Sequence, residues 1–121
     1  MAAILIVEDE PFVRMMAEDA AQSLGLRPLS ATSGEAAIAA ARAAPVLEIL
    51  FTDINMPPGP DGWTVARAVR EIHPRIRVIY TSGQAGPEDC ARLGVPQSRL
   101  LSKPYTQDEL AAVIGEIAGD G

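Results

Sequence analysis

Cysteine, aromatic residues and long apolar runs are all scarce in this sequence of 121 residues. The single cysteine, Cys90, cannot form an internal disulfide, which excludes a disulfide-stapled scaffold and favours a reducing compartment. The longest apolar runs, such as residues 2–7, are too short to span a bilayer or to form a signal peptide. We therefore expect a soluble, cytoplasmic protein without a membrane partner.

Positive charge is scarce as well. Ten Lys and Arg residues stand against sixteen Asp and Glu residues, which gives a net charge of −6. A protein that binds DNA or RNA directly needs a basic surface, so this balance argues against a nucleic-acid partner. The length suits one domain, and a domain of this size can bury enough surface to fold without staples.

Two kinds of apolar pattern alternate along the chain. The continuous β-branched run at residues 3–7 is typical of a strand covered on both faces. Apolar residues then recur at helical spacing from Val13 to Leu24, and Gly25 ends that helix. Further strands are expected at 27–32, 47–52, 76–81 and 99–102, and further helices at 34–43, 62–72, 87–93 and after a capping box at 106–109. Five such repeats predict a parallel sheet with helices on both faces.

Polar side chains gather where the predicted strands end. In order along the chain they are Glu8, Asp9, Asp53, Thr81, Ser82 and Lys103. In an open α/β sheet, ligands bind beyond the carboxyl ends of the strands, so we expect these side chains to share one site. The end of the second strand carries only neutral residues, which suits an edge strand away from that site.

The chemistry of this set of side chains is that of phosphoryl transfer. Three carboxylates held together repel one another and need a cation at neutral pH. Oxygen ligands without Cys or His nearby suit a hard cation such as Mg²⁺. A metal, an ammonium and a hydroxyl can stabilise the charge of a phosphoryl group in transfer, and an aspartate can accept that group covalently.

These motifs, in this order, resemble the response-regulator receiver domain of two-component signalling. The likeness covers essentially the whole chain and rests on residues 6–9, 51–57, 61–62, 81–83 and 101–105. It implies a flavodoxin-like α/β fold, a (βα)5 doubly wound sandwich with a five-stranded parallel sheet of order 2-1-3-4-5. It also implies a single receiver domain over residues 1–121, with no output domain.

The resemblance implies a role for each acidic residue of the site. Asp53 would be the phosphoacceptor, modified to 4-aspartylphosphate. Asp9 and Asp53 would bind Mg²⁺ directly, and Glu8 would act mostly through a water. Asn55 would offer its backbone carbonyl to the same ion. These assignments make Mg²⁺ the cofactor that we expect from the sequence.

The resemblance also implies the groups that contact the phosphoryl oxygens. Lys103 would pair with one oxygen, and Pro104 would follow it through a cis peptide bond. A short hydroxyl at the end of the fourth strand would bond another. Ser82 matches the family better because the small Gly83 follows it, although Thr81 is the alternative. Alternation along a strand puts these two side chains on opposite faces.

The sequence departs from the family pattern in three places. The loop between Asp53 and residues 61–62 is one residue longer than the commonest form. Residues 83–99 are broken by Pro and Gly, so the fourth helix is expected to be short. Leu100 occupies the position where the family often has an aromatic switch residue, which leaves Tyr80 and Tyr105 as candidates for that role.

The function implied by the resemblance is a switch set by phosphorylation. A histidine kinase or a histidine phosphotransfer protein would phosphorylate Asp53, and the acyl phosphate would shift an inactive–active equilibrium. The signal would pass to an unidentified protein target by binding or by onward phosphotransfer. The domain would not be an enzyme beyond self-catalysed phosphorylation and dephosphorylation of its own aspartate.

Two other classes of protein remain open from the sequence. A phosphorylation-independent adaptor could keep the fold, although the acidic pair, Asp53 and Lys103 argue against it. A Mg²⁺-dependent phosphatase of the haloacid-dehalogenase type also uses an aspartate, a hydroxyl and a lysine. That class has an Asp-x-Asp pattern after its first strand, whereas here Asp53-Ile54-Asn55 follows the third. An FMN carrier is poorly supported because no phosphate-cradling loop follows the first strand.

Overall fold

Strands and helices alternate five times along residues 2–119, which are the residues that this computed structural model describes. The strands are β1 (Ala3–Val7), β2 (Arg27–Ala31), β3 (Ile49–Asp53), β4 (Arg77–Ser82) and β5 (Ser98–Ser102). The helices are α1 (Pro11–Ser23), α2 (Gly34–Ala43), α3 (Gly62–Ile72), α4 (Pro87–Leu93) and α5 (Gln107–Gly119). The alternation predicted from the apolar patterns is confirmed, and so is the short fourth helix.

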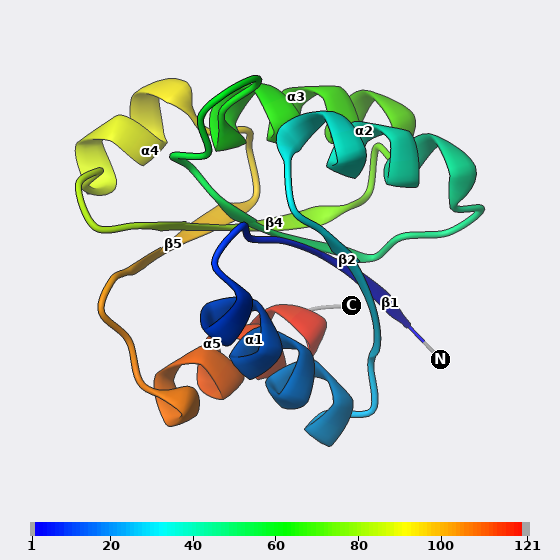
Figure 1. Cartoon of the computed structure of the whole chain (residues 1–121), viewed down its shortest axis with the longest axis vertical. Helices are drawn as coiled ribbons and strands as arrows, with labels where there is room; N and C mark the ends of the chain where they lie inside the picture. The colour runs from blue at the N-terminus through cyan, green and yellow to red at the C-terminus, as the bar shows by residue number, and fades with distance from the viewer. Residues whose placement is uncertain (1, 120–121) are drawn as a thin grey trace.

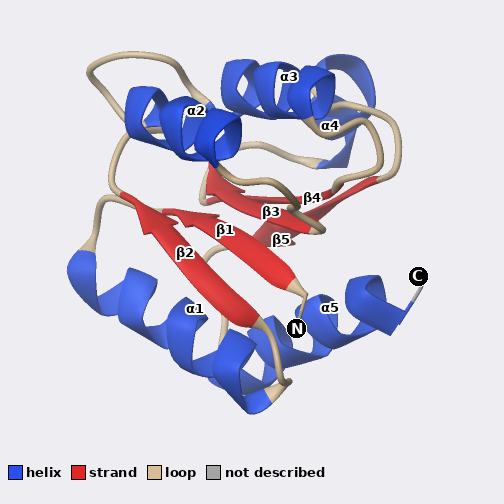
Figure 2. Cartoon of the chain, turned by 90° about the vertical axis from the view of Figure 1, so that its right-hand side faces the viewer, coloured by secondary structure: helices blue, strands red, loops and turns tan. Residues whose placement is uncertain are grey.

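The five strands form one parallel sheet in the order β2-β1-β3-β4-β5. Helices α2, α3 and α4 cover one face of the sheet, and α1 and α5 cover the other (Figures 1 and 2). This is the flavodoxin-like, doubly wound arrangement predicted from the sequence. The order places β1 beside β3 and β4 beside β5, so the ends of these four strands meet at one edge of the molecule.

The central strands divide their side chains between two separate apolar cores. The core under α2, α3 and α4 includes Leu5, Val7, Leu50, Val78 and Tyr80. The core against α1 and α5 includes Ile4, Ile6, Phe51, Ile79 and Leu101. Because successive side chains of a strand point to opposite faces, a residue two positions further along the strand faces the same core. This rule decides which polar side chains reach the site described below.

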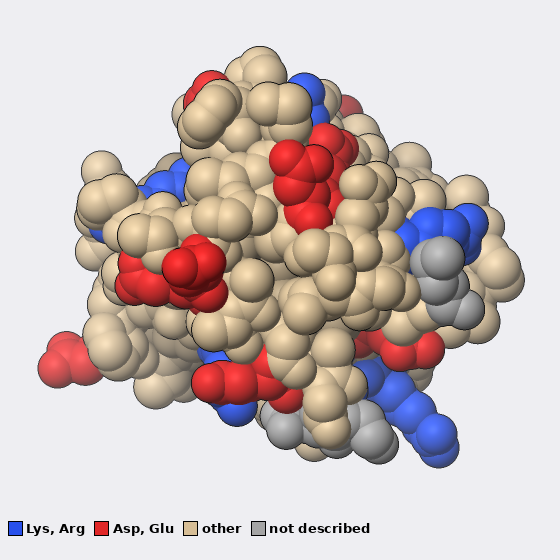
Figure 3. Space-filling view, turned by 90° about the horizontal axis from the view of Figure 1, so that it is seen from below, with Lys and Arg blue, Asp and Glu red and all other residues tan. Residues whose placement is uncertain are grey.

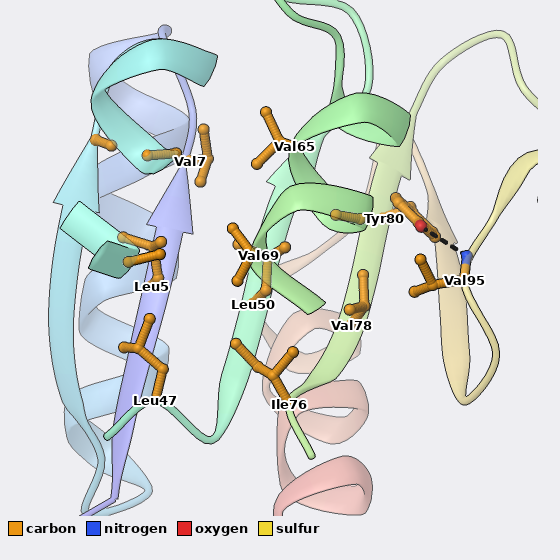
Figure 4. Close-up of a cluster of buried hydrophobic side chains, with 14 of the residues drawn as sticks. Leu5, Val7, Leu47, Leu50, Val65, Val69, Ile76, Val78, Tyr80 and Val95 are labelled. Atoms are coloured by element: carbon orange, nitrogen blue, oxygen red, sulfur yellow. Dashed lines mark hydrogen bonds between the residues drawn. The ribbon is translucent and has the colours of Figure 1, made fainter. Parts of the chain in front are cut away.

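Tyr80 is the largest fully buried side chain in the core under α2, α3 and α4. Its ring centroid lies 4.6 Å from that of Trp63, at a tilt of 54°. Its hydroxyl accepts a hydrogen bond of 3.0 Å from the backbone N–H of Val95, drawn as a dashed line in Figure 4. The tyrosine therefore joins β4 to the turn between α4 and β5.

Side chains at the starts of α1 and α5 cap these helices by accepting hydrogen bonds from backbone N–H groups of the first turn. Glu10 accepts hydrogen bonds from the backbone N–H groups of Phe12 and Val13, at 3.2 and 2.8 Å. Thr106 and Glu109 form a reciprocal capping box, with bonds of 3.0 and 3.1 Å. The predicted capping box of the last helix is therefore confirmed.

Several predicted strand boundaries are wrong by one or two residues. The third strand was expected at residues 47–52 but runs from Ile49 to Asp53, and the fourth ends at Ser82 instead of residue 81. Leu47 is buried in the core without pairing in the sheet, so the apolar run begins before the strand does. Asp53 and Ser82 pair with neighbouring strands although they are polar, which extends both strands to the site.

The surface of the described residues carries separate acidic groups. Figure 3 looks onto the face formed by α1 and α5 and shows several groups of Asp and Glu with uncharged surface between them. Among residues 2–119, none of the helices has both the length and the apolar character needed to cross a membrane.

Candidate phosphoacceptor site

The alternation of the strands brings three charged side chains to the same side of the sheet. Glu8, Asp53 and Lys103 lie two positions after Ile6, Phe51 and Leu101, which are members of the core against α1 and α5. The same rule that buries those apolar residues therefore turns the three charged side chains toward one another at the carboxyl end of the sheet. Residues 8, 53 and 103 are far apart in the sequence, and only the parallel fold brings them together.

Lys103 joins the two buried carboxylates. Its Nζ lies 3.1 Å from Oδ2 of Asp53 and 3.4 Å from Oε1 of Glu8. The side chains of Glu8 and Asp53 are 1% and 8% exposed, whereas that of Lys103 is 29% exposed. One ammonium thus serves two carboxylates that water hardly reaches, and each ion pair is stronger than an exposed one would be.

Asp9 completes an acidic cluster on the exposed side of the site. Glu8, Asp9 and Asp53 each offer a carboxylate oxygen, and these oxygens lie within 4.8 Å of one another. Lys103 pairs with only two of the three carboxylates, so the cluster keeps an excess of negative charge. An all-oxygen donor set with unbalanced charge fits a hard divalent cation, and the residues present therefore suit Mg²⁺.

The pKa values of the site reflect this crowding of charge. Burial raises the pKa of Glu8, and the nearby charge of Asp53 adds to that effect, although the N–H of Glu10 and Lys103 oppose it. Burial alone would lower the pKa of Lys103, but its hydrogen bond to Asp53 and the charge of Glu8 outweigh that effect and raise it. The site therefore favours the ammonium form of Lys103 and disfavours the ionised form of Glu8.

The β3–α3 loop carries Asn55 beside the phosphoacceptor candidate. Its backbone N–H lies 3.4 Å from Oδ1 of Asp53, and the residue is exposed. The start of α3 packs closely against the backbone of Asp53. Gly62 permits this approach, because any Cβ at this position would clash with the carbonyl oxygen of Asp53. Gly62 is a supporting residue that the sequence reasoning missed, since it entered only as part of a motif. A glycine directly after the N-cap Asp61 is the signal that could have pointed to it.

Two neighbouring hydroxyls at the end of β4 differ in their partners. Ser82 is buried, and its Oγ accepts 3.0 Å hydrogen bonds from the backbone N–H groups of Gln84 and Ala85. Within the described part of the chain, its own proton has no acceptor. Thr81 is also buried, but its Oγ1 has no hydrogen-bond partner among the described residues. The two side chains lie on opposite faces of the sheet, as the alternation predicts.

The three residues considered for the switch surface occupy different layers. Leu100 is half-buried against the core under α2, α3 and α4, where it pairs in register with the fully buried Tyr80. Tyr105 packs against the opposite core, and burial raises the pKa of its phenol, helped by the charges of Glu8 and Asp53. Tyr105 therefore lies nearer the acidic cluster, and Tyr80 nearer α4. The Lys103–Pro104 peptide bond is cis, as the resemblance implied.

Comparison with known proteins identifies the family of this chain. The family model described as the response regulator receiver domain matches residues 4–115. Sensor kinase CckA of Brucella abortus is 36% identical over 120 residues, which are 96% of this chain. The chain spans only 12% of the length of that kinase.

Solved structures agree with this family match. A response regulator receiver protein from Sinorhizobium medicae superposes with a TM-score of 0.88 and 32% identity, over 98% of this chain and 94% of the other. The receiver domain of sensor histidine kinase PA1611 from Pseudomonas aeruginosa, with a magnesium ion in its active-site cleft, gives a TM-score of 0.80 and 27% identity over 98% of each chain. The chain belongs to the response regulator receiver domain family of two-component signalling.

Proposed function

We propose that this receiver domain is a phosphoacceptor, and that Asp53 receives a phosphoryl group from a histidine kinase or a histidine phosphotransfer protein. The observation that supports this most directly is the buried Asp53 carboxylate, 3.1 Å from the ammonium of Lys103 and inside a cluster of three acids. A carboxylate in such a place is shielded from water on most sides and still open to a partner at the end of the sheet.

The transfer itself needs few covalent changes. A carboxylate oxygen of Asp53 attacks the phosphorus of a phosphohistidine on the partner, and an O–P bond forms while the N–P bond breaks. The electron pair of the broken bond leaves with the imidazole nitrogen. The product is 4-aspartylphosphate, an acyl phosphate. In the reverse sense of the switch, water attacks the phosphorus, and the carboxylate and inorganic phosphate are released.

Lys103 and Ser82 stabilise the charge on the phosphoryl group during this transfer. Lys103 moves from Oδ2 of Asp53 to a phosphoryl oxygen, a short movement for a long side chain that is 29% exposed. Ser82 donates its free proton to a second phosphoryl oxygen, while the N–H groups of Gln84 and Ala85 hold its Oγ in place. Such donors matter most where charge develops during the reaction.

Glu8, Asp9 and Asp53 are the carboxylates that would hold Mg²⁺, with the backbone carbonyl of Asn55 as a further oxygen ligand. When bound, Mg²⁺ supplies positive charge that offsets the repulsion between these carboxylates and an incoming phosphoryl group. The acidic cluster fits this role because its donor atoms are all oxygens and one ammonium does not neutralise them.

The phosphorylated state signals through a change of conformation. The acyl phosphate shifts an existing equilibrium between two states and alters the surface around α4, β5 and α5, which includes Leu100. A downstream protein binds that surface, or the phosphoryl group passes on to a further histidine. The domain catalyses only the phosphorylation and dephosphorylation of its own aspartate, in the cytoplasm.

Incubation with acetyl phosphate and Mg²⁺ tests the assignment of Asp53. The wild-type protein should gain the mass of one phosphoryl group, and Asp53→Asn should gain none. Asp19→Asn is the matched control, because Asp19 is an exposed aspartate on α1 outside the site. Phosphate uptake by Asp53→Asn to the wild-type level would refute the proposal. A wild-type protein that takes up no phosphate would instead favour an adaptor.

A further inference from the structure

Thr81 carries a buried hydroxyl for which the structure of residues 2–119 provides no partner. The residue is 0% exposed, and its Oγ1 neither donates nor accepts a hydrogen bond among the described residues. Water would satisfy such a hydroxyl in the unfolded chain, so its burial without a bond is unfavourable. A valine would fill the same space without this cost. Packing alone therefore does not explain why this position carries a hydroxyl.

Two other buried hydroxyls at the same end of the sheet do have partners. Thr52 donates a 2.9 Å hydrogen bond to the carbonyl oxygen of Asp53. Ser82 accepts hydrogen bonds from two backbone N–H groups of its own loop. Of these three hydroxyls, Thr81 alone keeps its full capacity to donate and accept.

Thr81 lies directly beside the phosphoacceptor candidate. Its Cα pairs in register with that of Asp53 on the neighbouring strand. Thr81 follows Ile79 by two positions, as Asp53 follows Phe51, and both apolar residues belong to the core against α1 and α5. The two side chains therefore point to the same face, and adjacent strands are only about 4.8 Å apart. The Thr81 hydroxyl is therefore carried by the strand next to Asp53 and on the same face as its carboxylate.

In the unphosphorylated protein, the Asp53 carboxylate is bonded to Lys103. Oδ2 is bonded to Lys103 at 3.1 Å, and among residues 2–119 the hydrogen bond to Oδ1 is the 3.4 Å contact from the N–H of Asn55. If Lys103 moves to the phosphoryl group, the Asp53 carboxyl group loses this donor. Thr81 is a buried donor on the adjacent strand that has no other partner among the described residues.

We propose that Thr81 is a further hydrogen-bond donor of the site, which bonds the Asp53 carboxyl oxygen not linked to phosphorus once the acyl phosphate has formed. The inference rests on the proposed function of Asp53. Ser82 and Thr81 then have different roles, because Ser82 contacts the phosphoryl group and Thr81 contacts the aspartyl carbonyl. The hydroxyl is unused in the free protein and used in the phosphorylated one, so it favours the phosphorylated state.

A pair of substitutions at one position tests this role. Thr81→Val keeps the shape and removes the hydroxyl, and Thr81→Ser keeps the hydroxyl and removes a methyl group. With acetyl phosphate and Mg²⁺, the Val variant should be phosphorylated more slowly, by up to about tenfold, which is the upper end of the net worth of one hydrogen bond. It should also bind beryllofluoride, a stable mimic of the phosphoryl group, about tenfold more weakly. The Ser variant should stay close to wild type in both measurements.

The melting temperature of the free protein separates this role from a structural one. Thr81→Val should melt at the wild-type temperature or above, because no hydrogen bond is lost before phosphorylation. A Val variant that is phosphorylated and binds beryllofluoride like the wild type would overturn the inference, and leave Thr81 as a packing residue. That result would leave the proposed function intact, which fails only if the wild-type protein is not phosphorylated on Asp53.

A measurement on the unaltered chain serves if the Val variant does not fold. NMR of the wild-type protein should show the Thr81 hydroxyl proton as a slowly exchanging signal when beryllofluoride and Mg²⁺ are added. The signal should be absent from the free protein, where the hydroxyl has no acceptor. Its absence from both states would also overturn the inference.

Discussion

The two ends of the parallel sheet hold charge in different ways. At the carboxyl end, Glu8 and Asp53 are buried, and among residues 2–119 it is Lys103 that pairs with both carboxylates. At the amino end, Arg77 is the first residue of β4 and Arg99 the second residue of β5, and both line a pocket against the end of α5. The first end has too many carboxylates for its cation, and the second end is rich in arginine.

The arginines of the amino end are already provided with partners. Nη1 of Arg77 donates a 3.1 Å hydrogen bond to the carbonyl oxygen of Ile117, and Arg99 pairs with Glu116. The Arg99 and Glu116 side chains are 45% and 59% exposed, so water also solvates them. Buried, unbalanced charge therefore lies at the end of the sheet for which we propose a chemical function, whereas the Arg99–Glu116 pair at the other end is exposed.

Removing the cation from each end should give the largest difference. Lys103→Met leaves Glu8 and Asp53 buried side by side without a positive charge, and should lower the free energy of unfolding by about 2–3 kcal/mol. Arg77→Met removes one hydrogen bond and should cost about 1 kcal/mol. Urea unfolding followed by the fluorescence of Trp63 measures both. Equal losses would contradict the distinction between the two ends.

Magnesium should stabilise the carboxyl end only. At a Mg²⁺ concentration ten times the dissociation constant, binding to the folded state raises the free energy of unfolding by about 1.4 kcal/mol. Removal of the ion with EDTA should reverse the effect. Asp9→Asn should abolish it, whereas Asp108→Asn, an exposed change on α5, should not. Thermal unfolding with and without Mg²⁺ tests this prediction. If Mg²⁺ stabilises Asp9→Asn as much as the wild type, the ion binds at a site that does not include Asp9.

Much of the fold was predictable because the apolar pattern and the caps are local. The bounds of α2, α3 and α4 could be predicted from the sequence, and the strand order came with the resemblance to the family. The errors fall at strand ends such as Asp53, where pairing with Thr81 continues past the apolar run. Polarity at a strand end looks like a loop in the sequence, and only the neighbouring strand shows that it is paired.

The charged residues of the site were predictable for a different reason. Glu8, Asp53 and Lys103 follow apolar strands, and parallel strands must bring their carboxyl ends together. The roles of the hydroxyls were not predictable in this way. Ser82 and Thr81 are adjacent in the sequence, and only the packed structure shows that one is bonded and the other is not.

The buried Glu8 carboxylate should destabilise the folded protein in the absence of metal. Glu8→Gln removes the charge and keeps an acceptor for the N–H of Glu10. It should raise the free energy of unfolding at pH 7.5 by about 1 kcal/mol, because burial and the nearby charge of Asp53 together outweigh the attraction of Lys103.

The gain from Glu8→Gln should depend on pH. Because the pKa of Glu8 is higher in the folded state than in the unfolded chain, the folded state binds a proton first as the pH falls. The wild type therefore gains stability between the raised pKa and the ordinary pKa of a glutamate. The advantage of the variant should therefore shrink between neutral pH and about pH 4.5. Denaturant unfolding at a series of pH values measures this difference in stability. If the advantage of Glu8→Gln grows on acidification, the pKa of Glu8 is lowered in the folded state and the prediction is wrong.

The amino end should respond least to the same kind of change. Glu116→Gln removes the acidic partner of Arg99 from an exposed pair, and should change the free energy of unfolding by no more than about 0.5 kcal/mol. A loss as large as that of Lys103→Met would mean that exposure does not separate the two ends. A small loss of stability in Glu116→Gln, together with a gain of stability in Glu8→Gln, would show that neutralising an acid has opposite effects at the two ends. The reason is that Glu8 is buried beside other carboxylates, whereas Glu116 is exposed.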